Sequence, residues 1–207
     1  MRVLLCVLAA LAVAGGVAHA DDTDDEDGAF VGLPKRSMGL GFIGHGTRIG
    51  GHSEGGFGPS LEFAIGRDRW QYVGEALLSS TSMSQWTTGA VDMDTSGKMV
   101  HAAAGVRWLA RQFRIDNDGG LELFLLSMLG FQRFYFDDGG RLSRPELAIG
   151  WGFQVRMYKR PRLAFHLDAR IVFTPNDAES TLVACRGSCS MEEGASTGFM
   201  TGFGLSW

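Results

Sequence analysis

The sequence has 207 residues and a formal net charge of −4, which suits one domain of ordinary size. Thirty residues are glycine, 11% are aromatic and 20% are charged. These figures exclude a polybasic nucleic-acid binder and a wholly disordered chain, and the glycine excess opposes a long-helix protein. A chain rich in glycine and aromatic residues, with modest charge, is expected to be a β protein.

Residues 1–20 have the pattern of a cleaved secretory signal peptide. Arg2 supplies the positive start, residues 3–17 are almost all apolar, and an A-x-A cleavage site ends at Ala20. The alternative, an uncleaved anchor helix, needs about 20 apolar residues and no cleavage site. We therefore predict an exported protein that is cleaved after Ala20.

An acidic segment, residues 21–36, follows the signal peptide. Six of its first seven residues are Asp or Glu, and like charges so close together repel one another and cannot pack. A disordered tether is the preferred interpretation, and a cation-binding tail is the alternative.

From Ser37 to Trp207 apolar residues recur with a period of two, which is typical of β-strands. The pattern is clearest in the last three segments of the chain, where large apolar residues alternate with Gly, Ala and polar residues. It predicts eight strands, at residues 37–46, 58–66, 69–80, 98–109, 121–136, 145–158, 162–174 and 195–207.

The connections between the predicted strands alternate in length. Two are tight turns, at residues 67–68 and 159–161. Three are long and rich in Gly, Ser and Thr, at residues 47–57, 81–97 and 175–194. Two break the alternation, since 110–120 is long and 137–144 is short. Short turns at one end and long loops at the other indicate an up-and-down outer-membrane barrel.

The large apolar side chains are expected to face lipid. The interior of an eight-stranded barrel is just wide enough for side chains or one small ligand. It would not hold Trp151, Phe165, Phe203 and the other bulky residues of the same faces, as a soluble lipocalin-like carrier would require. The prediction is an all-β protein, an eight-stranded antiparallel up-and-down transmembrane β-barrel over residues 37–207, in which about 9–11 residues of each strand cross the membrane.

Four aromatic residues are predicted at one membrane interface, the periplasmic one, together with the tight turns and the C-terminus. They open or close their strands at the same level, as an aromatic girdle requires. These residues are Trp70, Tyr72, Trp108 and Trp207.

With these features the chain resembles the small eight-stranded outer-membrane β-barrel proteins of Gram-negative bacteria, such as the barrel domains of the outer membrane protein A and X type. Its end, Gly202 to Leu205 to Trp207, is similar to their C-terminal assembly signal, with a departure at Met200, where a polar residue is usual. The resemblance implies a porin-like monomer in the cell outer membrane that contacts outer-membrane lipid and the barrel-assembly machinery, with no nucleic-acid partner. It implies no particular activity.

Ten polar residues are predicted inside the barrel by the same parity. They must pair, because an unpaired buried charge is costly. A structural salt-bridge core is preferred over a charged plug that opens a small pore, since eight strands leave no continuous channel. The ten residues are Glu62, Glu75, His101, Arg107, Glu122, Gln154, Arg156, His166, Asp168 and Arg170.

We expect no catalytic residue, cofactor or metal. Lipid A deacylases and palmitoyltransferases share this architecture, and the deacylase type places a His and a Ser two residues apart on one face. Here Asp168 follows His166 and Ala103 follows His101 at that spacing. The predicted function is a non-enzymatic structural, membrane-integrity or surface-interaction role, with a lipid-modifying enzyme and a soluble carrier as the alternatives.

Cys185 and Cys189 are predicted to form a disulfide in a long outer loop. They lie four residues apart, and an exported protein meets an oxidising environment. A zinc site would need two further ligands nearby, and no His flanks the segment. Cys6 is expected to leave with the signal peptide.

Overall fold

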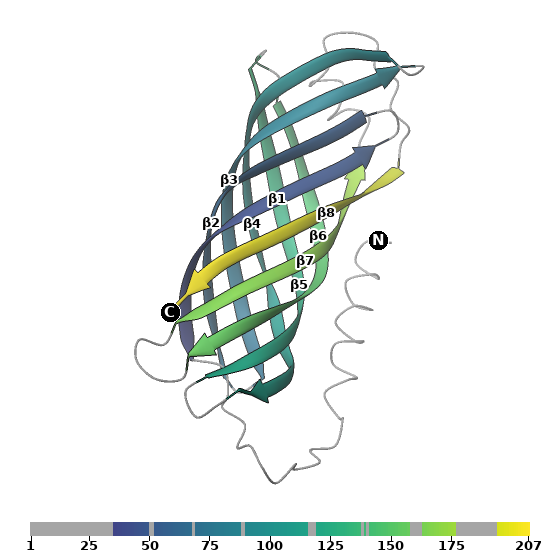
Figure 1. The fold of residues 1–207 in the computed structure, drawn as a ribbon. Helices are drawn as coiled ribbons and strands as arrows, with labels where there is room; N and C mark the ends of the chain where they lie inside the picture. Colours follow the sequence, from purple (N-terminus) through teal and green to yellow (C-terminus); the bar gives the residue numbers. More distant parts are fainter. Residues whose placement is uncertain are drawn as a thin grey trace. The chain divides into compact units, whose positions relative to one another are not determined.

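In a computed structural model, the chain forms a closed barrel of eight antiparallel strands (Figure 1). The structure describes residues 35–49, 52–67, 69–87, 90–115, 119–137, 139, 141–157, 163–176 and 194–207, which all belong to one compact unit, Gly32–Trp207. The strands are β1 (Arg36–Ile49), β2 (His52–Arg67), β3 (Trp70–Thr87), β4 (Ala90–Arg114), β5 (Gly119–Phe136), β6 (Arg141–Met157), β7 (Ala164–Asn176) and β8 (Gly194–Ser206). The eight-stranded all-β barrel predicted from the sequence is confirmed.

Every strand pairs with its neighbours in the sequence, and β1 also pairs with β8 to close the ring. This seam runs from Gly39 opposite Ser206 to Arg48 opposite Thr197. Two further backbone hydrogen bonds join Met38 and Trp207, at 3.0 and 2.9 Å. The seam thus places the start of β1 and the C-terminus at the same end of the barrel, which we call the C-terminal end. No helix in the described part of the chain is long and apolar enough to cross a membrane.

The strands are longer than the sequence pattern predicts. The predicted long loops 47–57 and 81–97 are wrong, because β1 and β2 are separated only by residues 50–51 and β3 and β4 only by residues 88–89. At the end opposite the C-terminus, β4 extends beyond Gly97, the last of its residues that pairs with β5. Strand pairing continues there through segments such as 79–82, which are polar on both faces and therefore carry no apolar period.

The connections at 110–120 and 137–144 are also shorter than predicted. β4 continues to Arg114 and β5 begins at Gly119, while β6 begins at Arg141. In the second of these turns Gly139 has a φ of 89°, a left-handed conformation that glycine adopts without steric cost. Connections are therefore short at both ends of the barrel, and the longest one joins β7 and β8 through residues 177–193.

Side chains alternate between the two faces as the period-two pattern requires. On β6, Trp151 is 61% exposed, while its neighbours Gly150 and Gly152 are buried. The register between β6 and β7 places Gln154 opposite His166 and Gly152 opposite Asp168. Large apolar residues therefore cover the outside of the barrel, and the polar residues of these strands face inward.

Some inward glycines stand where the barrel has no room for a side chain. A Cβ on Gly41 would lie 2.4 Å from the carbonyl oxygen of Phe203, across the β1–β8 seam. A Cβ on Gly152 would lie 2.4 Å from the Phe124 ring. Both distances are far below van der Waals contact, so the side chains that cross the interior depend on these glycines.

The predicted signal peptide and most of the acidic segment, residues 1–34, lie outside the described residues. Cys185 and Cys189 lie outside them as well. The domain boundaries at 20 and 36 and the disulfide remain predictions from the sequence.

Candidate functional site

The interior of the barrel is the candidate site, because the structure gathers buried charged residues there. All ten residues predicted for this network are buried, from Glu122 at 0% to His166 and Arg156 at 7% exposure. They come from six strands, β2 to β7, and most of them lie within direct contact of one another.

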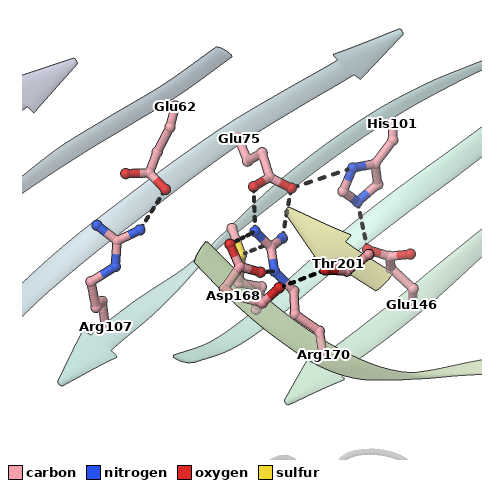
Figure 2. Close-up of polar contacts among 9 residues, drawn as sticks. Glu62, Glu75, His101, Arg107, Glu146, Asp168, Arg170 and Thr201 are labelled. Carbon is pink, nitrogen blue, oxygen red and sulfur yellow. Dashed lines mark hydrogen bonds and ion pairs between the residues drawn. The ribbon is translucent and has the colours of Figure 1, made fainter. Parts of the chain in front are cut away.

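Arg170 is the centre of the network. Its guanidinium forms a two-pronged pair with Glu75, with both N–O distances at 2.7 Å, and its Nε lies 2.6 Å from Asp168 (Figure 2). Glu75 is on β3 and Arg170 on β7, so the pair ties together strands that are not neighbours in the sheet. Bidentate pairs of this kind combine charge attraction with fixed geometry.

His101 continues the network toward the end opposite the C-terminus. Its Nε2 lies 2.5 Å from Glu146 and its Nδ1 3.8 Å from Glu75 (Figure 2). Gln132 donates a hydrogen bond to Glu146 and accepts one from Arg144 at 3.0 Å. Arg144 in turn pairs with Glu54 on β2, and the chain of contacts that begins at Asp168 ends there.

A second cluster lies nearer the C-terminal end. Glu122 accepts hydrogen bonds from Arg156 Nε at 3.1 Å, from Gln112 at 3.0 Å and from Gln154. Three donors around one carboxylate satisfy most of its hydrogen-bonding capacity, which explains how a fully buried Glu122 is accommodated.

Between the two clusters, Arg107 pairs with Glu62 at 2.5 Å. Its guanidinium also lies over the Phe124 ring, 4.8 Å from the ring centre. A cation over an aromatic face is attracted by the ring electrons, so Arg107 is held by one charge and one ring.

A small cavity of about 10 Å³ separates Glu62 from the Arg170 cluster. Such a volume is close to the minimum that holds one water molecule. His166 lines it together with Glu62, Glu75, Asp168 and Arg170. The polar lining and the size suit a bound water rather than a substrate or an ion path.

Several network members were missed in the sequence. Glu54 lies in the segment taken for a loop, and Arg144 lies one residue outside the predicted strand. The parity that selects Gln154 and Arg156 on β6 also selects Arg144 and Glu146, so extending the alternation would have found both. Glu122 and Gln132 likewise share a parity on β5.

His45 is a further interior residue that the prediction lacked. Its Nε2 lies 3.0 Å from Ser79 Oγ and 3.5 Å from Thr81 Oγ1. The period of β1 places Gly39, Gly41 and His45 on one face, which was the available signal. This His–Ser contact is buried inside the barrel, away from the lipid-facing surface where the deacylase-type arrangement lies.

The predicted interface aromatics lie at the C-terminal end. Trp70 is opposite Trp108, with ring centres 6.1 Å apart. Tyr72 is 74% exposed and lies two residues further along β3, and Trp207 is half exposed beside Met38. In the terminal segment Leu205 faces outward and Gly202 inward. No group of three or more His, Cys, Asp or Glu side chains in the described part of the chain is arranged to hold a metal ion.

The comparisons bear on the fold. No protein-family model matches this chain, and a search of curated proteins finds no match. Among solved structures, Neisserial surface protein A (NspA) superposes with a TM-score of 0.52 at 10% sequence identity, covering 84% of this chain and 96% of its own. The chain has the fold of the small eight-stranded outer-membrane barrels. Ail, the attachment invasion locus protein of Yersinia pestis, matches with a TM-score of 0.38 at 18% identity, over 84% of this chain and 100% of its own.

Proposed function

We propose that this protein resides in the outer membrane as a closed, non-enzymatic barrel that carries its outer segments at the cell surface, in a structural or surface-interaction role. The observation that carries the proposal is the distribution of side chains. Among the described residues, the exposed large apolar side chains lie on the outside of the barrel, and the buried charged groups lie inside it.

The height of the apolar surface fits a membrane. On β4 the outward residues from Val100 to Trp108 span eight residue steps, or about 27 Å along the strand at about 3.4 Å per residue. At a tilt of about 40° this corresponds to roughly 21 Å of membrane depth, close to the apolar band of about 25 Å in such barrels. A soluble carrier would need a polar surface over the same area.

The filled interior supports a closed barrel rather than an open pore. Arg170 crosses to Glu75, Arg107 pairs with Glu62, and the cavity between these pairs has room for about one water molecule. The protein would thus act through its surfaces, and not as a conduit for solutes.

We base the direction of insertion on the predicted export signal and the interface aromatics. Cleavage after Ala20 would release the chain into the periplasm, where the terminal segment ending at Trp207 is presented for assembly. The C-terminal end, with the interface aromatics, would face the periplasm. The β3–β4 hairpin would then extend outside the cell.

Cell fractionation with gel electrophoresis of unheated samples tests the proposal. The protein should remain with the outer membrane after a wash with alkaline carbonate, and its mobility should change when the sample is boiled, because the closed barrel resists detergent at room temperature. A soluble periplasmic protein with the same mobility before and after boiling would contradict it.

The enzymatic alternative has its own readout. Mass spectrometry of lipid A from cells with and without the gene should give identical acylation patterns. Loss or gain of an acyl chain would contradict the non-enzymatic part of the proposal and leave the barrel itself in place.

A further inference from the structure

Three cations lie together on the outward face of the barrel, on adjacent strands. Lys98 on β4 is opposite Tyr135 on β5, which is opposite Arg141 on β6. Arg133 lies on β5, two residues from Tyr135, and all three cationic side chains are exposed. We call Lys98, Arg133 and Arg141 the cationic edge.

The cationic edge marks the upper limit of the apolar surface. Two residues below Lys98 and Arg133 on their strands are Val100 and Phe131, 46% and 49% exposed. At the level of the edge, Ser80 is opposite Lys98 and Ser143 is opposite Arg133, and Ser96 follows two residues beyond Lys98. The edge therefore lies at the end opposite the C-terminus, at the depth where acyl chains give way to headgroups.

The geometry concentrates positive charge. Neighbouring strands are about 4.8 Å apart, so the backbones of Lys98 and Arg141 are separated by about 10 Å. Arg133 is steered by Tyr135, with its guanidinium 5.3 Å from the ring centre. Asp137 is the acidic residue among the described side chains near this edge. Its Oδ2 accepts a hydrogen bond of 2.6 Å from Ser96 Oγ. A net positive charge remains.

Below Lys98, Val100 is opposite Leu78, and beyond this pair the outward face of β3 and β4 carries small residues. Ala76 is opposite Ala102, and Gly74 is opposite Ala104. Ala102 and Ala104 lie in line with Lys98 on the same face of β4. Small side chains leave space close to the backbone, where an acyl chain can lie against the strands beneath a headgroup held at Lys98.

From this arrangement we infer that the cationic edge binds the phosphate groups of an anionic lipid in the outer leaflet, with its acyl chains along the small-residue face of β3 and β4. The inference rests on the proposed membrane location. Arginine matches phosphate with paired donors, and basic residues at an apolar boundary attract anionic headgroups.

The test uses the protein purified in detergent from membranes, with lipid binding followed by native mass spectrometry. The probes are bisphosphorylated lipid A and the same lipid A with its phosphates removed. The triple variant Lys98→Gln, Arg133→Gln, Arg141→Gln is compared with a matched control at the C-terminal end, Lys35→Gln, Arg36→Gln, Arg111→Gln. Each set removes one lysine and two arginines and alters exposed side chains.

The unaltered protein should bind the phosphorylated lipid at least tenfold more tightly than the dephosphorylated one. Each basic residue near an anionic surface contributes about 1 kcal/mol, which is about fivefold in affinity. The triple variant should therefore lose roughly tenfold to a hundredfold, while the control set should stay within about twofold of the unaltered protein.

Three results would overturn the inference: equal binding of the two lipids by the unaltered protein, equal losses in the two variant sets, or displacement of the lipid by inorganic phosphate at the concentration at which the lipid binds. The last would indicate a free-anion site. The comparison of the two lipids on the unaltered protein does not depend on folding of the variant. If the electrophoretic mobility changes on boiling but the protein binds both lipids equally, only this inference is contradicted. If the mobility does not change on boiling, the proposed function is contradicted.

Discussion

Large and small side chains are distributed in opposite ways between the inward and outward faces on two sides of the barrel. On β3 and β4, large apolar residues face inward, including Val73, Leu77 and Met99, while the outward face has Gly74, Ala76, Ala102 and Ala104. On β6 and β8 the inward positions include Gly150, Gly152, Gly202 and Gly204, and the outward positions hold Trp151, Phe199 and Phe203.

The difference shows how a narrow interior is filled. We call β3 and β4 one wall of the barrel and β6 to β8 the glycine-rich wall. The large inward residues of the first wall fill the interior, whereas the glycines of the second leave space that long charged side chains cross. Gly150 is opposite Arg170 in the register, and a Cβ there would lie 2.8 Å from Arg170 Cγ. Arg170 can therefore turn away from its own wall and reach Glu75 on the other.

Removing the contact between the walls should have the largest effect. Arg170→Met leaves Glu75 and Asp168 buried without their cation, and breaking a buried pair in this way costs about 3–5 kcal/mol. Urea titration of the protein in lipid vesicles should show that decrease in the free energy of unfolding.

The control for this change removes the two carboxylate charges together with the charge of Arg170. Arg170→Met combined with Glu75→Gln and Asp168→Asn should recover a large part of the stability, because no uncompensated charge remains. A single Arg170→Met variant as stable as the unaltered protein would mean that the two walls do not depend on this pair.

A charge placed on the outside of the glycine-rich wall should have the next largest effect. Trp151 is at the middle of the outward apolar run of β6, so Trp151→Arg should cost about 2–4 kcal/mol at the bilayer midplane. Met157→Arg, at the end of the same strand, should cost about 0–1 kcal/mol. Equal costs in vesicle unfolding experiments would show that depth does not matter and that this face does not meet lipid.

Filling the space on the glycine-rich wall should have the smallest effect. Gly152→Ala forces a methyl group toward the Phe124 ring and the Leu167 carbonyl oxygen, at 2.4 and 2.5 Å, and overpacking of this kind costs about 1–3 kcal/mol. Gly74→Ala is the control, because its nearest neighbour would be 3.9 Å away.

A second substitution sharpens that comparison. Phe124→Leu shortens the side chain that Gly152 accommodates, so it should restore part of the stability lost in Gly152→Ala. Additive losses in the double variant, measured by the same urea titration, would show that the two residues do not share one space.

The same contrast explains what the sequence could predict. On β6 to β8 most inward positions are small or polar and the outward ones are mostly large and apolar, so these strands could be predicted from the sequence. On β5 both faces carry large apolar residues, such as Leu125 outward and Leu126 inward, and the period is weaker. Packing across the interior requires large apolar residues on the inward face of β5, and the sequence of a single strand does not indicate that requirement.

Strand ends were the least predictable feature. The extension of β3 to Thr87 and of β4 from Ala90 includes the polar run 79–82, in which the alternation that predicts a strand is missing. The same misjudged ends removed Glu54 and Arg144 from the predicted network. The partners of each charge depend on the barrel's closure, which brings Arg170 to Glu75 across 95 positions of sequence and cannot be read from either strand alone.

The seam between β1 and β8 sets the order in which the barrel forms. Gly39 pairs with Ser206, whereas the other seven pairings join strands consecutive in the chain. Closing a longer loop costs more entropy, and non-local contacts slow folding. Hairpins therefore form early and ring closure is the last step, after the final strand has been delivered. Until then β1 and β8 offer open edges to any other chain, so the protein is most prone to aggregate before the ring closes.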